Sequence, residues 1–383
     1  MNANLPLEGL TVIDLSQFLA GPLASLKLAD MGAKVIKIER PGAGDLTRSI
    51  YLSDTDVEGI NTLFHAINRN KLSFTADLKS EKDLEKVRKL LSIADVVIQN
   101  FRPGVIERLG LDYESVKLLN PSIIYASISG YGVSEEWHSL PGQDLLAQAK
   151  SGLMWLNGND NSPPSPVGLA LADMLTGHNA TQGILAALVR KGINQQGAHI
   201  ETSLIESTLD FQFEVLTTYL NDGNRDPVRS KNNSAHAYLA APYGVYETQD
   251  GYVAIAMAAV NKLGTLIGSE ELAKFHDKQE WFSKRDEIKE IIAKQLKMQT
   301  SLYWMDIFVS ADIWASEVLD WKTLMKSKGF NELDFIQELH LSSGEKIKTT
   351  RSPIRIDGQL LKSTIPAPLV GEHTKEIITE FKL

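Results

Sequence analysis

Residues 10–39 read LTVIDLSQFLAGPLASLKLADMGAKVIKIE, and this stretch decides the kind of fold. Two apolar runs, 10–15 and 34–39, have the length and composition of buried strands. Between them lies a helical stretch that opens near Pro22, a residue suited to a first helical turn, and runs to Gly32. The stretch therefore predicts a strand, a helix and a second strand, which is the repeating unit of a parallel sheet.

The same alternation continues through the first 130 residues. Apolar runs at 95–99 and 123–128 predict two more strands, and apolar residues at helical spacing predict a helix over 81–93. Strands that alternate with helices indicate a mainly parallel sheet covered by helices. The predicted fold class is therefore α/β, with a large doubly wound, Rossmann-like domain.

The second half of the chain has a different organisation. Polar stretches at 157–166 and 222–234, rich in turn-forming residues, predict two loops. Asp250-Gly251 lies between two runs that predict a hairpin, and the charged stretch 285–297 has a helical pattern. We therefore expect a second, smaller α+β domain.

Composition excludes several classes of protein. The 383 residues carry a formal net charge of −9, which disfavours a protein that binds the phosphate backbone of nucleic acids. The absence of cysteine excludes disulfides, thiolate nucleophiles and Cys-based metal sites. The eight histidines lie apart without ligand spacing, so we predict no metal site. No signal peptide or membrane-spanning run is visible, and the predicted location is cytoplasmic.

A dinucleotide-dependent oxidoreductase is the first alternative that this pattern suggests. Its phosphate-binding turn needs three glycines, but residues 15–25 contain one. Asp173 suggests a different chemistry, because it emerges from an apolar run before a helix predicted over 175–189. The residues alone allow two interpretations: Asp173 is the N-cap of that helix, or it is a base or nucleophile in an apolar cleft.

Basic residues recur near the predicted carboxyl ends of strands. They are Arg40, Lys71, Lys79, Arg102 and Arg108. Doubly wound sheets bind ligands at these ends, so the pattern indicates either a phosphorylated, elongated ligand or ordinary surface charge.

A collinear series of short motifs resembles one known family. The motifs are Gly9–Ser16, Ala20-Gly21-Pro22, Gly32–Glu39, Gly44–Arg48, Asn70-Lys71, Asn100–Gly104, Arg108-Leu109-Gly110, Ser127–Gly132, Leu171-Ala172-Asp173, Pro242–Tyr246 and Pro366–His373. In this order they resemble the family III CoA-transferases, a group that also contains the 2-methylacyl-CoA racemases. The resemblance covers essentially the whole chain.

The resemblance implies a domain organisation and a partner. The large CoA-binding domain would span 1–205 and be closed by 355–383, with a linker at 206–237. The small domain would span 238–330, and a return linker would occupy 331–354. Two such chains would thread through each other as an interlocked ring homodimer, with no nucleic acid or membrane partner.

The resemblance also implies the site and its chemistry. Asp173 matches the catalytic aspartate, which would form a mixed anhydride and then an aspartyl-CoA thioester while CoA moves from an acyl-CoA to a carboxylic acid. No metal or permanently bound cofactor is expected, and coenzyme A enters as substrate. The expected CoA contacts are Arg40, Ala76, Asp77, Leu78, Lys79, Asn100, Phe101, Arg102, Arg108 and Gln143.

Departures from the family motifs separate the alternatives. Racemases carry histidine in a Gly-His-Asp triplet, whereas this chain has Gln143, which cannot act as an acid or a base. Formyl-CoA transferases tend to have tyrosine at position 143 and glutamine at the position of Leu19, so the oxalate/formyl substrate pair is not expected either. A CoA-transferase is predicted, with a racemase as the alternative; an oxidoreductase and a non-catalytic CoA-binding module are more distant ones.

Overall fold

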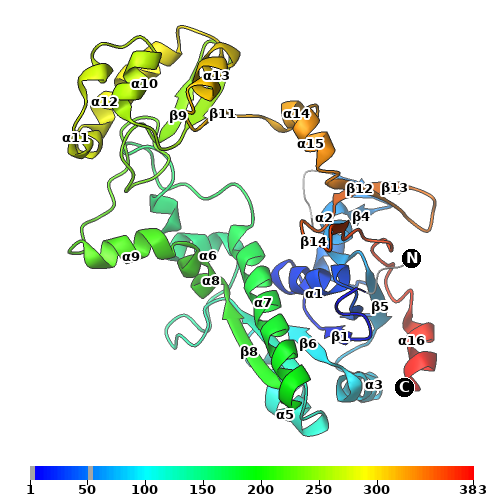
Figure 1. The fold of residues 1–383 in the computed structure, drawn as a ribbon. Coiled ribbons are helices and arrows are strands. Elements are labelled where there is room, and N and C mark those ends of the chain that lie inside the picture. Colours follow the sequence, from blue (N-terminus) through cyan, green and yellow to red (C-terminus); the bar gives the residue numbers. More distant parts are fainter. Residues whose placement is uncertain (1–4, 51–54) are drawn as a thin grey trace. The chain divides into compact units, whose positions relative to one another are not determined.

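The computed structural model describes residues 5–50 and 55–383 (Figure 1). The remaining residues, 1–4 and 51–54, were predicted to belong to the large domain and lie outside the described residues. The described chain divides into two compact units. The large unit comprises residues up to 147, 170–211 and 333–383, and the small unit comprises 148–169 and 212–332.

A six-stranded sheet forms the centre of the large unit, and neighbouring strands pair in parallel throughout. Its order is β5-β2-β1-β6-β7-β8. The strands are β1 (Thr11–Asp14), β2 (Lys34–Glu39), β5 (Lys71–Thr75), β6 (Val96–Gln99), β7 (Ile124–Ser129) and β8 (Ala198–Ser203). The chain thus places its first strand centrally and builds outward in both directions, as doubly wound dinucleotide-binding folds do. The predicted fold class is confirmed.

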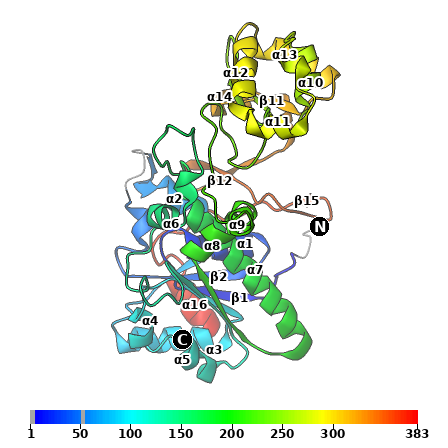
Figure 2. The same cartoon turned by 90° about the vertical axis from the view of Figure 1, so that its left-hand side faces the viewer.

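Two hydrophobic cores, one on each face, explain why this sheet is covered by helices on both sides. Side chains alternate across a strand, so Val12 enters one core and Ile13 the other. Helices α1 (Ala20–Asp30) and α7 (Leu171–Asn194) pack on the face of Val12. Figure 2 shows them on one side of the sheet, with α3 (Glu81–Ile93) on the other. Strands buried on both faces read as continuous apolar runs, which is the pattern that the sequence shows.

Helix α7 differs from its prediction. It begins at Leu171 and ends at Asn194, whereas the sequence pattern predicted 175–189. Asp173 therefore lies inside the first helical turn, and the N-cap position belongs to Ala170. The interpretation of Asp173 as an N-cap is wrong, because the apolar residues before it already belong to the helix.

Shorter elements complete the large unit. They are η1 (Leu46–Arg48), β3 (Asp56–Val57), β4 (Ile60–Asn61), α2 (Thr62–Asn68), α4 (Val105–Arg108), α5 (Tyr113–Leu119), α8 (Leu204–Phe211), β12 (Ile336–His340), β13 (Lys346–Thr350), β14 (Arg355–Ile356), β15 (Gln359–Leu360) and α16 (Thr374–Phe381). Residues 333–354, expected within the return linker, contain the antiparallel pair β12–β13. Helix α6 (Asp144–Lys150) runs from the large unit into the next segment.

The small unit contains a three-stranded antiparallel sheet with helices around its own core. Strands β9 (Gly244–Glu247) and β10 (Tyr252–Ile255) form the hairpin predicted around Asp250-Gly251, and β11 (Ala315–Glu317) pairs with β10. The other elements are η2 (Leu153–Trp155), α9 (Phe213–Asn221), α10 (Val260–Leu266), η3 (Leu272–Lys274), α11 (Lys278–Ser283), α12 (Arg285–Leu296), α13 (Ser301–Ser310), α14 (Trp321–Leu324) and α15 (Lys328–Glu332). A search of the described residues found no helix with the length and hydropathy needed to cross a bilayer.

Candidate active site

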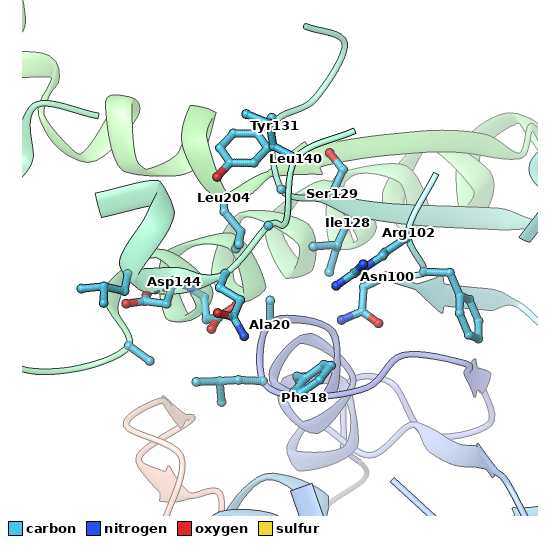
Figure 3. A pocket seen from close by; sticks show the side chains of 18 of the residues that line it. Phe18, Ala20, Asn100, Arg102, Ile128, Ser129, Tyr131, Leu140, Asp144 and Leu204 are labelled. Atoms are coloured by element: carbon cyan, nitrogen blue, oxygen red, sulfur yellow. Dashed lines mark hydrogen bonds between the residues drawn. The ribbon is translucent and has the colours of Figure 1, made fainter. Parts of the chain in front are cut away.

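A pocket of about 480 Å³ lies at the carboxyl ends of β1, β6 and β7, and all its lining residues belong to the large unit (Figure 3). This is the edge where the strand order reverses between β1 and β6, the position at which doubly wound sheets bind ligands. Most of the wall is apolar. The apolar lining side chains are Phe18, Leu19, Ala20, Ile50, Leu63, Phe101, Pro103, Ile128, Leu140, Leu145, Ala170 and Leu204.

Two carboxylates, Asp173 and Asp144, line this pocket together. The backbone N–H of Asp173 donates to Oδ1 of Asp144 over 3.2 Å, which ties the first turn of α7 to the start of α6. Burial, followed by the like charge of Asp144, raises the pKa of Asp173 to about 7. Near neutral pH, Asp173 therefore exchanges between a protonated and an ionised form.

A pair of glycines sets the position of Asp144. A Cβ atom built on Gly142 would lie 2.6 Å from the Cα of Gly130, and one built on Gly130 would meet Gly142 at the same distance. The hydroxyl of Tyr131 also donates to the carbonyl of Pro141 over 3.2 Å. The turn after β7 and the turn before α6 are thus in direct backbone contact, and any larger side chain at either glycine would push Asp144 away.

A buried cluster of charges joins β1, β2 and β5 and contacts the loop that follows β1. The Lys71 ammonium donates to Asp14 over 3.1 Å, and both side chains are fully buried. The Lys37 ammonium lies 2.7 Å from Asp45. Burial opposes ionisation of Asp14, but Lys37 and Lys71, with the hydroxyls of Ser16 and Ser25, hold its pKa well below the usual range. Each buried lysine in the cluster therefore lies next to a carboxylate of opposite charge.

Comparison with known proteins identifies the family. The family described as CoA-transferase family III matches residues 7–374. The chain belongs to this family. Human succinyl-CoA:glutarate CoA-transferase is 30% identical to it over 386 aligned residues, which cover 99% of this chain and 87% of the relative. The acetyl-CoA:oxalate CoA-transferase of Acetobacter aceti is 37% identical over 328 residues, 82% of this chain and 81% of that one.

A solved structure agrees with this assignment. The crystal structure of a CaiB/BaiF family protein from Brucella suis superposes with a TM-score of 0.85 at 32% sequence identity, covering 99% of this chain and 100% of that one. The resemblance inferred from short collinear motifs is therefore confirmed over nearly the whole chain.

The structure of this family III CoA-transferase separates the predicted site residues into two groups. Those that line the pocket are Asp173, Asn100, Phe101, Arg102 and Gln143. Those that do not line it are Arg40, Ala76, Asp77, Leu78, Lys79 and Arg108. The second group still lies at the same edge of the sheet: Arg40 directly follows β2, Ala76 directly follows β5, and Arg108 ends α4, which comes after β6. Ala76 and the end of β2 are joined by a backbone hydrogen bond from Ala76 to Glu39 (2.9 Å).

The prediction made from the sequence was wrong for one basic residue. Lys71 was grouped with cations at carboxyl ends of strands, but it is the first residue of β5 and is fully buried against Asp14. It therefore cannot meet a phosphate. Among the residues that the structure describes, no group of three or more His, Asp or Glu side chains could hold a metal ion.

The sequence did not indicate that Asp144 lines the pocket beside Asp173. In the sequence, Asp144 simply follows Gln143, and no pattern indicates a contact with Asp173, which is 29 positions away. The available signal was indirect: Gly130 and Gly142 allow the backbone before Asp144 to approach the turn after β7, but they do not point to Asp173.

The arginines at the sheet edge lead to a prediction about CoA affinity. Arg40, Arg102 and Arg108 are all exposed, so replacing each with alanine should weaken CoA binding by up to about fivefold, which corresponds to about 1 kcal/mol. Calorimetry with CoA at low and high salt measures the effect, and high salt should reduce it because exposed charges are screened. Arg190→Ala is the matched control, since this exposed arginine lies about 25 Å along α7 from Asp173. Equal CoA affinity in all four variants would show that these cations are ordinary surface charge.

Proposed function

We propose that this family III CoA-transferase moves CoA from an acyl-CoA to a carboxylic acid through covalent intermediates on Asp173. The observation that supports this most is the position of the Asp173 carboxylate: it lines an apolar pocket at the ligand-binding edge of the sheet, and its pKa is raised to about 7. A carboxylate with few water contacts is a stronger nucleophile than a solvated one.

The proposed reaction proceeds in balanced steps. The Asp173 carboxylate attacks the carbonyl carbon of the donor thioester, the C–S bond breaks, and a mixed anhydride and CoA thiolate form. The thiolate then attacks the aspartyl carbonyl, which releases the donor acid and leaves an aspartyl-CoA thioester. The acceptor carboxylate repeats these steps in reverse order, so the energy of the thioester bond is retained without a further cofactor.

The surroundings of Asp173 suit these steps in two ways. Its place in the first turn of the 24-residue helix α7 puts the positive end of the helix dipole next to the oxyanions that form. The apolar wall limits access of water, which would hydrolyse the anhydride. The backbone N–H of Asp173 itself does not serve as an oxyanion donor in this state, since it is bonded to Asp144.

Short dicarboxylic acids are the proposed substrates. Relatives at 30–37% identity are named for succinyl-CoA with glutarate, succinyl-CoA with mesaconate, and acetyl-CoA with oxalate. The test is a screen of acetyl-CoA and succinyl-CoA against oxalate, succinate, glutarate, mesaconate and matched monocarboxylic acids, with mass spectrometry of the new thioesters. Formation of no new thioester with any pair would contradict a transferase acting on these acids.

We also propose that two copies of the chain form a homodimer, and that this dimer is located in the cytoplasm. Helix α9 leaves large apolar side chains uncovered in a single chain: Phe213 is 68% exposed and Leu220 is 62% exposed. Such exposure supports burial against a second copy. Light scattering on the purified protein tests the dimer, and a monomer at micromolar concentration would contradict it.

The racemase alternative makes a different prediction about protons. A racemase removes the α-proton on one face of the carbon and returns it on the other, which requires two titratable groups. Of the neighbouring residues 140–148, only Asp144 has an acidic or basic side chain, and that carboxylate accepts the backbone N–H of Asp173. We therefore expect no deuterium at the α-carbon of a 2-methylacyl-CoA incubated in deuterated water. Incorporation that depends on Asp173 and needs no acceptor acid would overturn the transferase mechanism.

The pH dependence of the reaction should report on the two carboxylates. Because Asp173 attacks only when ionised, kcat/KM should rise with pH through about 7. Asp144→Asn removes the like charge, which lowers the pKa of Asp173, so the rise should move to lower pH. It should stay above the range of a solvated aspartate, since burial is the larger cause of the shift. An unchanged pH profile in Asp144→Asn would show that Asp144 does not act on the ionisation of Asp173.

A further inference from the structure

A short loop after β1 forms the wall of the pocket opposite the carboxylates. In this loop, residues 15–19, the side chains of Phe18 and Leu19 line the cavity, as does Ala20, the first residue of α1. Phe18 has a backbone φ of +65°, a left-handed conformation that a phenylalanine rarely adopts. Its side chain is 44% exposed, so packing of the ring does not enforce this conformation. The groups that hold the backbone must lie elsewhere.

Asn100 holds the centre of the loop from both sides. Its Oδ1 accepts the backbone N–H of Gln17 over 2.8 Å, and its Nδ2 donates to the carbonyl of Gln17 over 2.7 Å. Both polar atoms of the amide are therefore engaged with the residue immediately before Phe18. Figure 3 shows Asn100 and Phe18 among the residues that line the pocket. The arrangement needs one acceptor and one donor on the same side chain, which asparagine supplies and aspartate does not.

The buried charges fix the two ends of the same loop. At the start, Asp14 accepts the backbone N–H of Ser16 (2.9 Å), and the Lys37 ammonium donates to the Ser16 carbonyl (2.8 Å). Just past the end, the Lys71 ammonium donates to the carbonyl of Pro22 over 2.8 Å. The fully buried lysines thus bond to backbone carbonyls at both ends of the loop as well as to carboxylates.

Helix α1, which begins directly after the loop, is in close contact with the helix that carries Asp173. A Cβ atom built on Gly177 of α7 would lie 2.7 Å from the carbonyl oxygen of Ala20. Gly177 is one helical turn after Asp173, so a shift of the loop that also moves the start of α1 would change the space between Asp173 and the pocket wall formed by Phe18, Leu19 and Ala20. A misplacement of 1 Å in such a site can cost about 100-fold in rate.

We infer that Asn100 is a positioning residue: its amide holds Gln17 so that Phe18, Leu19 and Ala20 form a fixed wall facing Asp173, and this wall selects the acid. The role differs from the CoA contact that the resemblance implied for Asn100. The part of the inference that concerns acid selection rests on the proposed function. The part that concerns the loop does not.

The test compares Asn100→Asp and Asn100→Ala with a matched control. Asn120 is a buried asparagine, whereas Asn100 is half-buried; the Nδ2 of Asn120 donates to two backbone carbonyls, those of Leu91 (3.1 Å) and Ala94 (2.8 Å), and Asn120 does not line the pocket. Asn120→Asp therefore measures the general cost of such a change. Circular dichroism establishes that each variant is folded.

Amide hydrogen exchange of the peptide covering residues 15–20 is the first readout. We expect faster exchange in both Asn100 variants and no change in Asn120→Asp. The second readout is kinetic: kcat/KM for the acid should fall by at least about tenfold, while the Kd for CoA stays within about twofold. If the amide hydrogens of residues 15–20 exchange at the parent rate in both Asn100 variants, the positioning role is wrong, whether or not CoA affinity falls. If exchange rises but no acid is converted even by the parent enzyme, the proposed function fails and the loop role stands.

Discussion

Asp173→Ala is expected to lower CoA exchange by at least about 10³-fold, because the variant lacks the carboxylate that forms both covalent intermediates. CoA affinity and the fold should change little. Among the described residues, the side chain of Asp173 makes no hydrogen bond, and the bond to Asp144 comes from the backbone N–H, which the substitution keeps. Turnover of acid into thioester, CoA calorimetry and circular dichroism measure the three properties.

Two further measurements separate nucleophilic attack from a positioning role. Asp173→Asn keeps the size of the side chain but is a much poorer nucleophile, so it should be as inactive as the alanine variant. With the parent enzyme and donor acyl-CoA, hydroxylamine should trap an adduct on the peptide that contains Asp173. A residual rate above a few per cent in both variants, or an adduct on another peptide, would assign the nucleophile elsewhere.

Lys71→Met should destabilise the protein by about 3–5 kcal/mol, because it removes one partner of a fully buried ion pair and leaves Asp14 without that compensation. The ammonium also donates to Asn68 and to the Pro22 carbonyl, and both acceptors would lose a partner. Urea denaturation followed by circular dichroism measures the loss.

The matched control is Lys34→Met. Lys34 lies on β2 and pairs with Glu380, but its side chain is 42% exposed, so the pair contributes about 1 kcal/mol or less. Equal denaturation midpoints for the two variants would show that the buried cluster of charges is dispensable for stability. A loss confined to Lys71→Met would show that burial, and not the ion pair as such, makes the lysine essential.

The sequence by itself determined the fold class and the identity of the main candidate residue. Strands β1, β2, β6 and β7 were predicted to within one or two residues, because buried strands are short segments rich in valine and isoleucine that a local pattern reveals. Asp173 was singled out for its apolar flanks and its match to a family motif. These are local features, which depend on a few consecutive residues.

Only the tertiary structure decided how the site is assembled. Asp144 meets Asp173 across 29 positions, Asn100 holds Gln17 across 83, and Lys71 meets Asp14 across 57. Lys71 was misread as a surface cation because a lysine in a sequence carries no mark of burial. It can be buried only because parallel pairing of β5 with β2, and of β2 with β1, brings a distant aspartate to it. Contacts of this kind follow from strand order and register in space, which no short stretch of sequence contains.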